Sequence, residues 1–397
     1  MFSLCAFTAE AFCDSLPPVL FGTTQKIAMT TFVDLFCGAG GLSLGLQQAG
    51  WRPLLAVDHW ADAIATYQTN FPDHLALQEE LQSLDKRKLQ GLLSQSPDWV
   101  VGGPPCQGFS TVGRRRKSDP RNLLVNEFAR IVDILQPKGI LVENVVGLRD
   151  MDFVGSITEL FQSLGYSVTS LVLRAADYGV PQLRHRIFFV GNRKGWQFVL
   201  PKPQLSPENY VTVWDAIGDL PELGPGEFAT KYSKSPKTPF QFRMRSGSTV
   251  LTSHVASRHP SHLVKAISHI PDGGNRKHIP PHLQPASGFH NSYSRLNSRA
   301  PAVAVTQNMG KPSGTRCIHP FQDRGLTARE GARLQGFPDT FRFSKGVTGQ
   351  RLQIANAVSP ILAELIGSAL DDRGSWKKTK PAFAKSLRQL CLIDSDG

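Results

Sequence analysis

The sequence predicts an α/β protein whose sheet is mostly parallel, together with a smaller irregular domain. Three features of the chain support this prediction. In the first half, apolar segments of strand length alternate with amphipathic segments of helix length. From about residue 192 the chain is rich in Pro, Ser and His and has no clear hydrophobic period. Ordered patterns return at about Tyr293, so the irregular part is expected to interrupt the α/β part.

The individual elements follow from the hydrophobic pattern. Strands are predicted at 31–36, 54–58, 98–101, 139–143, 167–173 and 186–191. Helices are predicted at 61–70, 123–135 and 327–334, and a final apolar run covers 354–370. The second helix has Leu124, Phe128, Ile131 and Leu135 at three- and four-residue spacing, as an amphipathic helix requires. Ligands of an open parallel sheet bind at the carboxyl ends of the strands, so unusual residues there are candidate site residues.

The length of the chain indicates two domains. It has 397 residues, of which 41% are hydrophobic, and single cores rarely outgrow ~250–300 residues. Its 44 Lys and Arg against 32 Asp and Glu give a formal net charge of +12, which favours a polyanionic partner. The stretch 228–292 holds nine Lys or Arg and a single acid, Asp272. The alternative interpretation of this stretch is a solvated, loop-rich insertion.

Cysteine and histidine usage argues against a metal or disulfide framework. Six cysteines are scattered singly with no C-x-x-C pair, which fits a reducing cytoplasm. Seven of the eleven histidines lie in 254–290, but no cysteine or clustered carboxylate joins them, so no metal site is expected. No run of 18 apolar residues predicts a membrane span, and the N-terminus lacks the charged start of a secretory signal. Residues 1–28 are interpreted as an irregular extension, with Met29 as a possible start.

A glycine-rich turn follows the first predicted strand. In FVDLFCGAGGLSLGL (32–46), the strand leads into Gly38, Gly40 and Gly41, and a helix opens near Leu42. Backbone N–H groups in such a turn can approach a ligand closely. Asp58, at the end of the next strand, is placed to accept hydrogen bonds from ribose hydroxyls. Because no phosphate-loop lysine follows the glycines, the turn suits a nucleoside better than a triphosphate.

Cys106 is the candidate nucleophile. Free cysteines are usually buried and inert, but this one follows a strand and the rigid Pro104-Pro105 pair in DWVVGGPPCQGFS (98–110). The basic run at 114–117 follows it, and nearby positive charge lowers the pKa of a thiol and increases its thiolate fraction. The long cationic loop 107–122 is predicted to close over a phosphate backbone.

A carboxyl group and two arginines are expected near this thiol. Glu143 ends an apolar strand in KGILVENVVGL (138–148), and QLRHRIFFVG (182–191) brings Arg184 and Arg186 to the start of another strand. A carboxylate beside an arginine is held in position and keeps strong hydrogen-bonding capacity.

These segments, with QDRGLTAREGARLQGFPDTFRF (322–343) and RLQIANAVSP (351–360), resemble the ordered motifs of the DNA (cytosine-5)-methyltransferases of bacterial restriction–modification systems. The resemblance covers about residues 31–370. It implies a Rossmann-like, S-adenosylmethionine-dependent methyltransferase domain and a smaller target-recognition domain. It also implies methyl transfer from S-adenosylmethionine to C5 of a flipped-out cytosine in a specific duplex sequence, through a covalent adduct of Cys106 at C6.

The resemblance implies a role for each matched residue. Catalysis is expected of Cys106, Glu143, Arg184 and Arg186. The cofactor pocket would be formed by Phe36, Gly38, Gly40, Leu42, Asp58, Pro105, Asn356 and Val358. Glu80 stands near the place of the acid in the family's Gly-Asp-Ile element and would contact the adenine amino group. DNA contacts are expected of Gln107, Ser110, Arg114, Arg243, Arg245, Arg258 and Arg276, with Asn275 a further candidate.

The implied organisation has five parts. They are the extension 1–28, a catalytic and cofactor-binding domain 29–191, the target-recognition domain 192–292, a return to the catalytic domain at 293–370, and a tail 371–397. The expected partner is double-stranded DNA, without a membrane, and the family's habit is a cytoplasmic monomer alongside a separate restriction endonuclease. Two alternatives remain open at this point: a tRNA cytosine-5 methyltransferase on the same scaffold, and a catalytically silent DNA-binding regulator.

Overall fold

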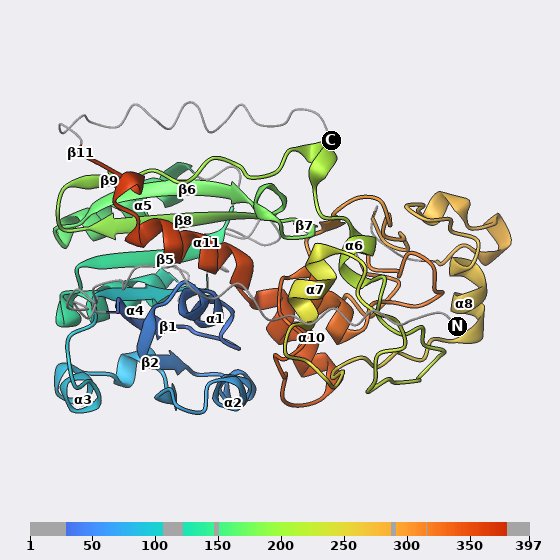
Figure 1. Cartoon of the computed structure of the whole chain (residues 1–397), viewed down its shortest axis with the longest axis horizontal. Coiled ribbons are helices and arrows are strands. Elements are labelled where there is room, and N and C mark those ends of the chain that lie inside the picture. The colour runs from blue at the N-terminus through green and yellow to red at the C-terminus, as the bar shows by residue number, and fades with distance from the viewer. Residues whose placement is uncertain (1–28, 106–121, 147–150, 287–290, 315, 379–397) are drawn as a thin grey trace, which may run out of the picture.

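A computed structural model describes residues 29–105, 122–146, 151–286, 291–314 and 316–378. They form two lobes (Figure 1): one is built on a twisted sheet with helices on both faces, and the other consists mainly of loops and short helices. The predicted α/β class, with a mostly parallel sheet, is confirmed.

The main sheet has seven strands in the order β3-β2-β1-β4-β5-β8-β6. Their bounds are β1 Thr31–Leu35, β2 Arg52–Asp58, β3 Ala76–Gln78, β4 Trp99–Gly102, β5 Gly139–Val145, β6 Ser167–Arg174 and β8 His185–Asn192. Only β8 runs antiparallel to its neighbours β5 and β6 among these strands. All six predicted strands form. The short edge strand β3 has no counterpart in the sequence prediction.

Helices cover both faces because side chains alternate along the strands. Phe32 of β1 joins a core cluster with α1 (Gly41–Gln48) and α11 (Pro360–Asp371). Val33 faces the other cluster, formed with α3 (Lys86–Leu92), α4 (Asn122–Leu135) and α5 (Met151–Ser163). In α4, Phe128 and Ile131 are fully buried, as their spacing predicts. The helix α2 (Ala61–Asn70) has the predicted bounds.

The final apolar run forms parts of two helices. The segment Val347–Asp371 is long and apolar enough to cross a membrane by length and composition alone. However, α10 (Val347–Asn356) ends before Ala357 and α11 starts at Pro360, and the segment is mostly buried within the protein. A Cβ atom on Gly45 of α1 would lie 2.2 Å from the Pro360 carbonyl, so the backbones of α1 and α11 are in direct contact. This run is therefore a core element that brings the end of the chain back to its beginning.

The remaining elements are short. The second lobe contains α6 (Val213–Ile217), α7 (Pro239–Arg245), α8 (Ser261–Ile267) and the 3₁₀ turns η5 (Arg276–His278) and η6 (Pro281–Leu283). Two small ladders pair β7 (Gln182–Leu183) with β10 (Ala302–Val303), and β9 (Trp196–Phe198) with β11 (Trp376–Lys378). The other 3₁₀ turns are η1 (Leu81–Ser83), η3 (Ala175–Tyr178), η4 (Pro207–Asn209) and η7 (Arg373–Ser375).

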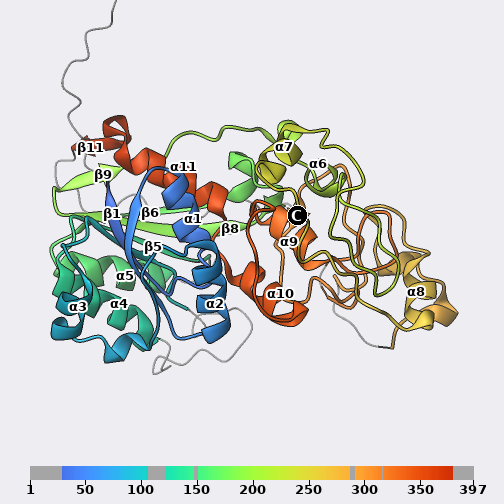
Figure 2. The ribbon, with the colours of Figure 1, turned by 60° about the horizontal axis from the view of Figure 1, so that its bottom comes forward.

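The helix α9 (Ala328–Leu334) lies between the sheet and the outer part of the second lobe (Figure 2). Thr327 caps it and forms a reciprocal capping box with Glu330, which explains why the predicted helix forms there. Arg333 of α9 is fully buried and donates to Asp219 and Asp339, with 2.6 Å between Arg333 Nη2 and Asp339 Oδ2. This helix therefore ties α6 to the segment that leads back to the sheet lobe.

Candidate functional site

A cavity of about 540 Å³ opens at the carboxyl ends of β1, β2, β4 and β5. The predicted cofactor residues that line it are Phe36, Gly38, Leu42, Asp58, Pro105, Asn356 and Val358. The predicted catalytic residues that line it are Glu143, Arg184 and Arg186. The fold therefore brings together residues from the start, middle and end of the chain.

The glycine turn shapes one wall of this cavity. Phe36 and Gly38 have positive φ angles of 58° and 54°, so the chain turns sharply after β1. A Cβ atom on Gly38 would meet no heavy atom within 4 Å, whereas one on Gly40 would lie 2.6 Å from the Phe71 ring. Gly40 thus serves packing beneath the turn, and it is not among the described residues that line the cavity.

Asp58 is fixed at the edge of the turn. Its carboxylate is buried and accepts the backbone N–H of Gly38 on Oδ2 and that of Trp60 on Oδ1, both at 2.9 Å. His59 Nδ1 also lies 3.4 Å from Oδ1, and a carboxylate has about four acceptor positions, so Oδ2 keeps one for a hydroxyl group in the cavity. This arrangement suits a ribose, as the sequence predicts.

The C-terminal return, which is the segment 356–358 between α10 and α11, closes the same wall of the cavity. A Cβ atom on Gly41 would lie 2.3 Å from the Val358 carbonyl, so only glycine allows this close approach. Asn356, Ala357 and Val358 line the cavity in the break between α10 and α11. An aromatic ring, a ribose-type carboxylate and a cavity of this size fit a nucleoside such as S-adenosylmethionine.

Glu143 of β5 and Arg186 of the neighbouring strand β8 form a buried ion pair in the wall of the cavity. Arg186 Nε lies 2.7 Å from Glu143 Oε1, and both side chains are little exposed. Burial lowers the pKa of the Arg186 guanidinium, and the Glu143 carboxylate opposes that effect. A Cβ atom on Gly103 would lie 3.2 Å from Glu143 Oε2, so glycine leaves this second oxygen accessible from the turn. Arg186 therefore orients the carboxylate through Oε1, and among the described residues Gly103 leaves space beside Oε2.

Arg184 makes different contacts from those of Arg186. It donates to the Ala355 carbonyl at 2.8 Å and to the Val305 carbonyl at 3.3 Å. Burial and the neighbouring Arg186 lower its pKa to about 9, and Glu143 partly opposes this shift. Arg184 therefore holds the C-terminal return in place and contributes positive charge toward Glu143, whereas the direct support of Glu143 comes from Arg186.

Asn144 is a site residue to which the sequence reasoning assigned no role. Its Nδ2 donates to the Pro104 carbonyl at 3.3 Å, and its Oδ1 accepts the Val145 N–H at 2.7 Å. It thereby ties the end of β5 to the Pro104-Pro105 turn that leads to Cys106. Its place directly after Glu143, at a strand end, was the available signal.

Several predicted residues lie elsewhere. Cys106, Gln107, Ser110 and Arg114 fall outside the described residues. Glu80 precedes η1 and is not among the described residues lining the cavity, so its adenine contact stays a prediction.

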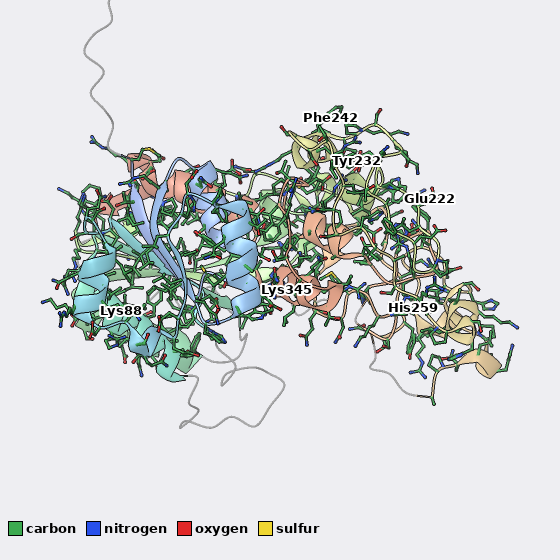
Figure 3. The ribbon with its side chains drawn as sticks, turned by 90° about the horizontal axis from the view of Figure 1, so that it is seen from below. Lys88, Glu222, Tyr232, Phe242, His259 and Lys345 are labelled. Carbon is green, nitrogen blue, oxygen red and sulfur yellow. The ribbon has the colours of Figure 1, made fainter. Side chains whose placement is uncertain are left out.

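The candidate DNA-binding arginines differ in their surroundings. Arg243 is paired with Glu364. Arg245 lies 3.3 Å from Asp219 and stacks on Tyr232, with 3.7 Å between guanidinium carbon and ring centre. Figure 3 labels Tyr232 and the exposed Phe242 on this lobe. Arg258 is exposed, and Arg276 lines a second cavity. Contacts with DNA remain predictions for all four.

Among the described residues, no group of three or more His, Cys, Asp or Glu side chains is arranged to hold a metal ion. The fold and the site define the class of S-adenosylmethionine-dependent methyltransferases. The features that define it are a Rossmann-like sheet with a ribose-type acid at the end of its second strand, a glycine turn without a phosphate-loop lysine, and a buried Glu–Arg pair.

Comparison with known proteins identifies the family. The family model for C-5 cytosine-specific DNA methylases matches residues 30–372, and the chain belongs to this family. Type II methyltransferase M1.HphI from Haemophilus parahaemolyticus is 41% identical over 350 residues, which is 86% of each chain. Type II methyltransferase M.DdeI from Desulfomicrobium norvegicum is 38% identical and covers 87% of this chain and 88% of its own.

Solved structures agree with the fold. A protein described as a DNA modification methyltransferase encoded within an E. coli prophage has a TM-score of 0.71 and 29% identity, covering 86% of this chain and 98% of its own. The protein is therefore a DNA (cytosine-5)-methyltransferase of the restriction–modification type that uses S-adenosylmethionine as methyl donor. Of the alternatives, neither tRNA methylation nor a silent regulator is favoured by these relatives.

Proposed function

We propose that this methyltransferase acts on a cytosine flipped out of a specific duplex sequence, with Cys106 as nucleophile and Glu143 as the group that binds the base. One observation carries the proposal. Pro105, the residue before Cys106, lines the same cavity as Glu143 and Asp58. Because Cys106 follows Pro105 directly in the sequence, we propose that its thiol attacks a base that contacts Glu143.

The chemistry requires covalent activation of the base. Carbon 5 of cytosine is a poor nucleophile because it belongs to an aromatic ring. Attack of the Cys106 thiolate on C6 forms a C–S bond and makes C5 enamine-like. Glu143 stabilises the ring at N3 by donating or sharing a proton, and Arg186 keeps this carboxyl group oriented.

S-adenosylmethionine, when bound, supplies an electrophilic methyl group on a sulfonium. Methyl transfer to C5 would leave S-adenosylhomocysteine; a base then removes the C5 proton, N3 returns its proton to Glu143, and the Cys106 thiolate leaves C6, which restores the aromatic ring. Water is the proposed base, since no side chain of the motifs is clearly placed for this step. Asp58 would hold the ribose, and Asn356 and Val358 would complete the pocket.

The target base must leave the duplex, since neither face of C6 is exposed in stacked DNA. Flipping costs a few kcal/mol. Phosphate contacts by the cationic loop that contains Ser110 and Arg114 would offset this energy, and Gln107 would contact the DNA from the same loop. The positive charge of the 228–292 stretch supports binding of a duplex over its length.

The biological setting is part of the proposal. The relatives at 41% and 38% identity are named as type II methyltransferases, which supports a role as the modification enzyme beside a separate cognate endonuclease. We propose that the protein acts as a monomer on nucleoid DNA in the cytoplasm.

Transfer of tritium from labelled S-adenosylmethionine tests the substrate. We expect label in duplex DNA and none in tRNA. Label in tRNA alone would overturn the proposal, and no label in either would favour a silent DNA binder. Sequencing of methylated cytosines in DNA from expressing cells would then define the recognition sequence.

A Cys106→Ala variant tests the catalytic assignment, and we expect it to bind S-adenosylmethionine without methylating DNA. Cys317→Ala is the matched control, because the Cys317 thiol is buried and its pKa is raised to about 12. Normal turnover by Cys106→Ala would reject the proposed mechanism.

A further inference from the structure

A second cavity, of about 690 Å³, lies in the irregular lobe and its chemistry is cationic. Four positively charged side chains line it: Arg276, Lys277, Arg295 and Arg316. No Asp or Glu occurs among the described residues of its lining. A cavity with this charge favours a ligand that is anionic or rich in hydrogen-bond acceptors.

The four cations do not have the same task. Arg295 is buried, pairs with Asp323 and donates to the carbonyls of Ile270 at 2.8 Å and Ile267 at 3.0 Å, so its charge is compensated and it holds the backbone beneath the cavity. Lys277 and Arg316 are exposed. Arg276 is half-buried, and its guanidinium is held at the cavity wall by hydrogen bonds to Gln284 and Pro285.

One edge of the Arg276 guanidinium is occupied by the protein. Nε donates to Gln284 Oε1 at 3.0 Å, and Nη2 donates to the Pro285 carbonyl. Gln284 is itself held, because its Nε2 donates to the Ile279 carbonyl at 2.6 Å and to the Arg276 carbonyl at 3.0 Å. The side chain is therefore locked through the short turns η5 and η6.

The opposite edge of the same guanidinium remains free. A guanidinium carries five N–H groups in a planar fork, and the bonds above use the edge formed by Nε and Nη2. Nη1 makes no hydrogen bond to a described residue, so Nη1 and the second hydrogen of Nη2 form a preorganised pair of parallel donors. Two parallel donors recognise two adjacent acceptors, and preorganisation reduces the entropy lost on binding.

The position of this cavity relates it to catalysis. Leu183 of β7 and Val303 of β10 line it, and the next residue after Leu183, Arg184, lines the catalytic cavity. The linings of the two cavities are therefore consecutive along the chain at β7. We infer that a duplex whose target base enters the catalytic cavity places neighbouring base pairs toward the second one.

We propose that Arg276 is a specificity-determining residue that reads a guanine of the recognition sequence in the major groove. Guanine presents N7 and O6 there as adjacent acceptors, which match a fork of two donors, and no other base presents this pair. Lys277 and Arg316 contact the neighbouring phosphates. This inference rests on the proposed function, since it presumes a specific duplex substrate.

Replacing single guanines tests the inference. Once sequencing has defined the recognition site, each of its guanines is replaced in turn by 7-deazaguanine, which keeps the base pair but lacks N7. For one guanine we expect kcat/KM of the wild type to fall by about 10- to 100-fold. Arg276→Ala should lose a similar factor on the natural site and be indifferent to this replacement, and Arg276→Lys should not restore the wild-type value because an ammonium cannot form the fork.

Arg299→Ala is the matched control. Arg299 is an exposed arginine of the same lobe that lies beside Asp215 and Asp272 in a different hollow, so this variant should retain the wild-type guanine dependence. If Arg276→Ala fails to fold, the wild-type series alone decides: indifference to every 7-deazaguanine overturns the inference. Unchanged guanine dependence in a folded Arg276→Ala also overturns it. A wild type that methylates no duplex would instead refute the proposed function itself.

Discussion

Asp34 is a polar residue buried directly beneath the glycine turn. The alternation of β1 directs its side chain toward α1, where Ser43 donates a hydrogen bond to Oδ2 at 2.6 Å. Its Oδ1 has no hydrogen-bond partner among the described residues. Burial raises the pKa of this carboxyl group to about 7, and the hydrogen bond from Ser43 only partly opposes the shift. Asp34 is therefore largely neutral in mildly acidic solution.

This shift predicts a pH-dependent stability. A carboxyl group whose pKa is higher in the folded than in the unfolded protein stabilises the fold below its ordinary pKa of about 4, and the benefit is lost as pH rises through about 7. Asp34→Asn removes the titration. Between pH 5 and pH 8 we expect the wild type to lose about 3 kcal/mol of unfolding free energy relative to this variant. Urea denaturation at both pH values measures the difference, and parallel changes in the two proteins would contradict the assignment.

Asp58→Asn tests the ribose contact. The amide keeps the shape of the carboxylate but loses its charge and part of its acceptor capacity. We expect the Kd for S-adenosylmethionine to rise by about tenfold, which corresponds to ~1.4 kcal/mol, with the melting temperature of the free protein little changed. Calorimetric titration measures the affinity. An unchanged Kd would show that Asp58 orders only the turn.

At the scale of single residues, the sequence predicted which residues the strand ends bring together, but it did not predict which contact each of them makes. Asp58 and Glu143 line the cavity because they lie toward the carboxyl ends of β2 and β5, which are parallel strands of one sheet. Gly40 has φ 96° and packs against aromatic rings, and a glycine pattern alone cannot distinguish that need from ligand contact. Likewise, the pairing of Arg243 with Glu364 joins residues far apart in the chain, which local charge cannot reveal.

Elements were predictable where the hydrophobic pattern was long enough. Each of the six predicted strands forms. The parallel strands β1, β4 and β5 are buried, near-continuous apolar runs, which makes them easy to predict. The strands β3, β9 and β11 have three residues each, and α6, α7 and α8 have five to seven, too few to show a period. Their positions depend on tertiary contacts. For example, β11 near the end of the described chain pairs with β9, which lies about 180 residues earlier in the sequence.

The contact between α1 and the C-terminal return gives a prediction for an element. Gly41→Ala would place a methyl group 2.3 Å from the Val358 carbonyl, so the return must shift. We expect a loss of about 1–3 kcal/mol of unfolding free energy, together with weaker S-adenosylmethionine binding. Thermal denaturation with and without the ligand measures both effects.

Gly91→Ala is the matched control for this substitution. Gly91 lies within α3, and a Cβ atom there would meet no heavy atom within 4 Å. This variant should be more stable by ~0.5–1 kcal/mol, because alanine favours a helix over glycine, and its affinity should not change. If both variants behaved alike, the close approach of Gly41 to Val358 would not matter for the pocket.

At the scale of the whole molecule, buried ion pairs hold segments of the loop-rich lobe together around α9. Arg333 links Asp219 and Asp339, and burial of all three makes the network dependent on every partner. The sequence predicted the division into a regular and an irregular part from its change in texture. It did not reveal that α9 links these segments, because the buried arginines of α9 resemble surface charge in a linear sequence.

The charge of the molecule predicts strong salt dependence of DNA binding. If the protein contacts six to ten phosphates, affinity for a duplex should fall by about 10³- to 10⁵-fold between 50 and 200 mM salt. Binding of S-adenosylmethionine should change far less, since it depends on short-range contacts in one cavity. Fluorescence anisotropy with a labelled duplex measures the first and calorimetry the second. Salt-independent DNA binding would contradict the cationic interface.

The central claim, that Cys106 attacks C6 of a cytosine held by Glu143, has a direct test. A duplex carrying 5-fluorocytosine at the target position lacks the C5 proton whose removal must precede release of the thiolate, so methyl transfer should leave protein and DNA joined. We predict a denaturant-stable complex that requires S-adenosylmethionine, maps by mass spectrometry to Cys106, and is absent in Cys106→Ala. Absence of a complex with the active wild type, or attachment at Cys37 or Cys317, would contradict the mechanism.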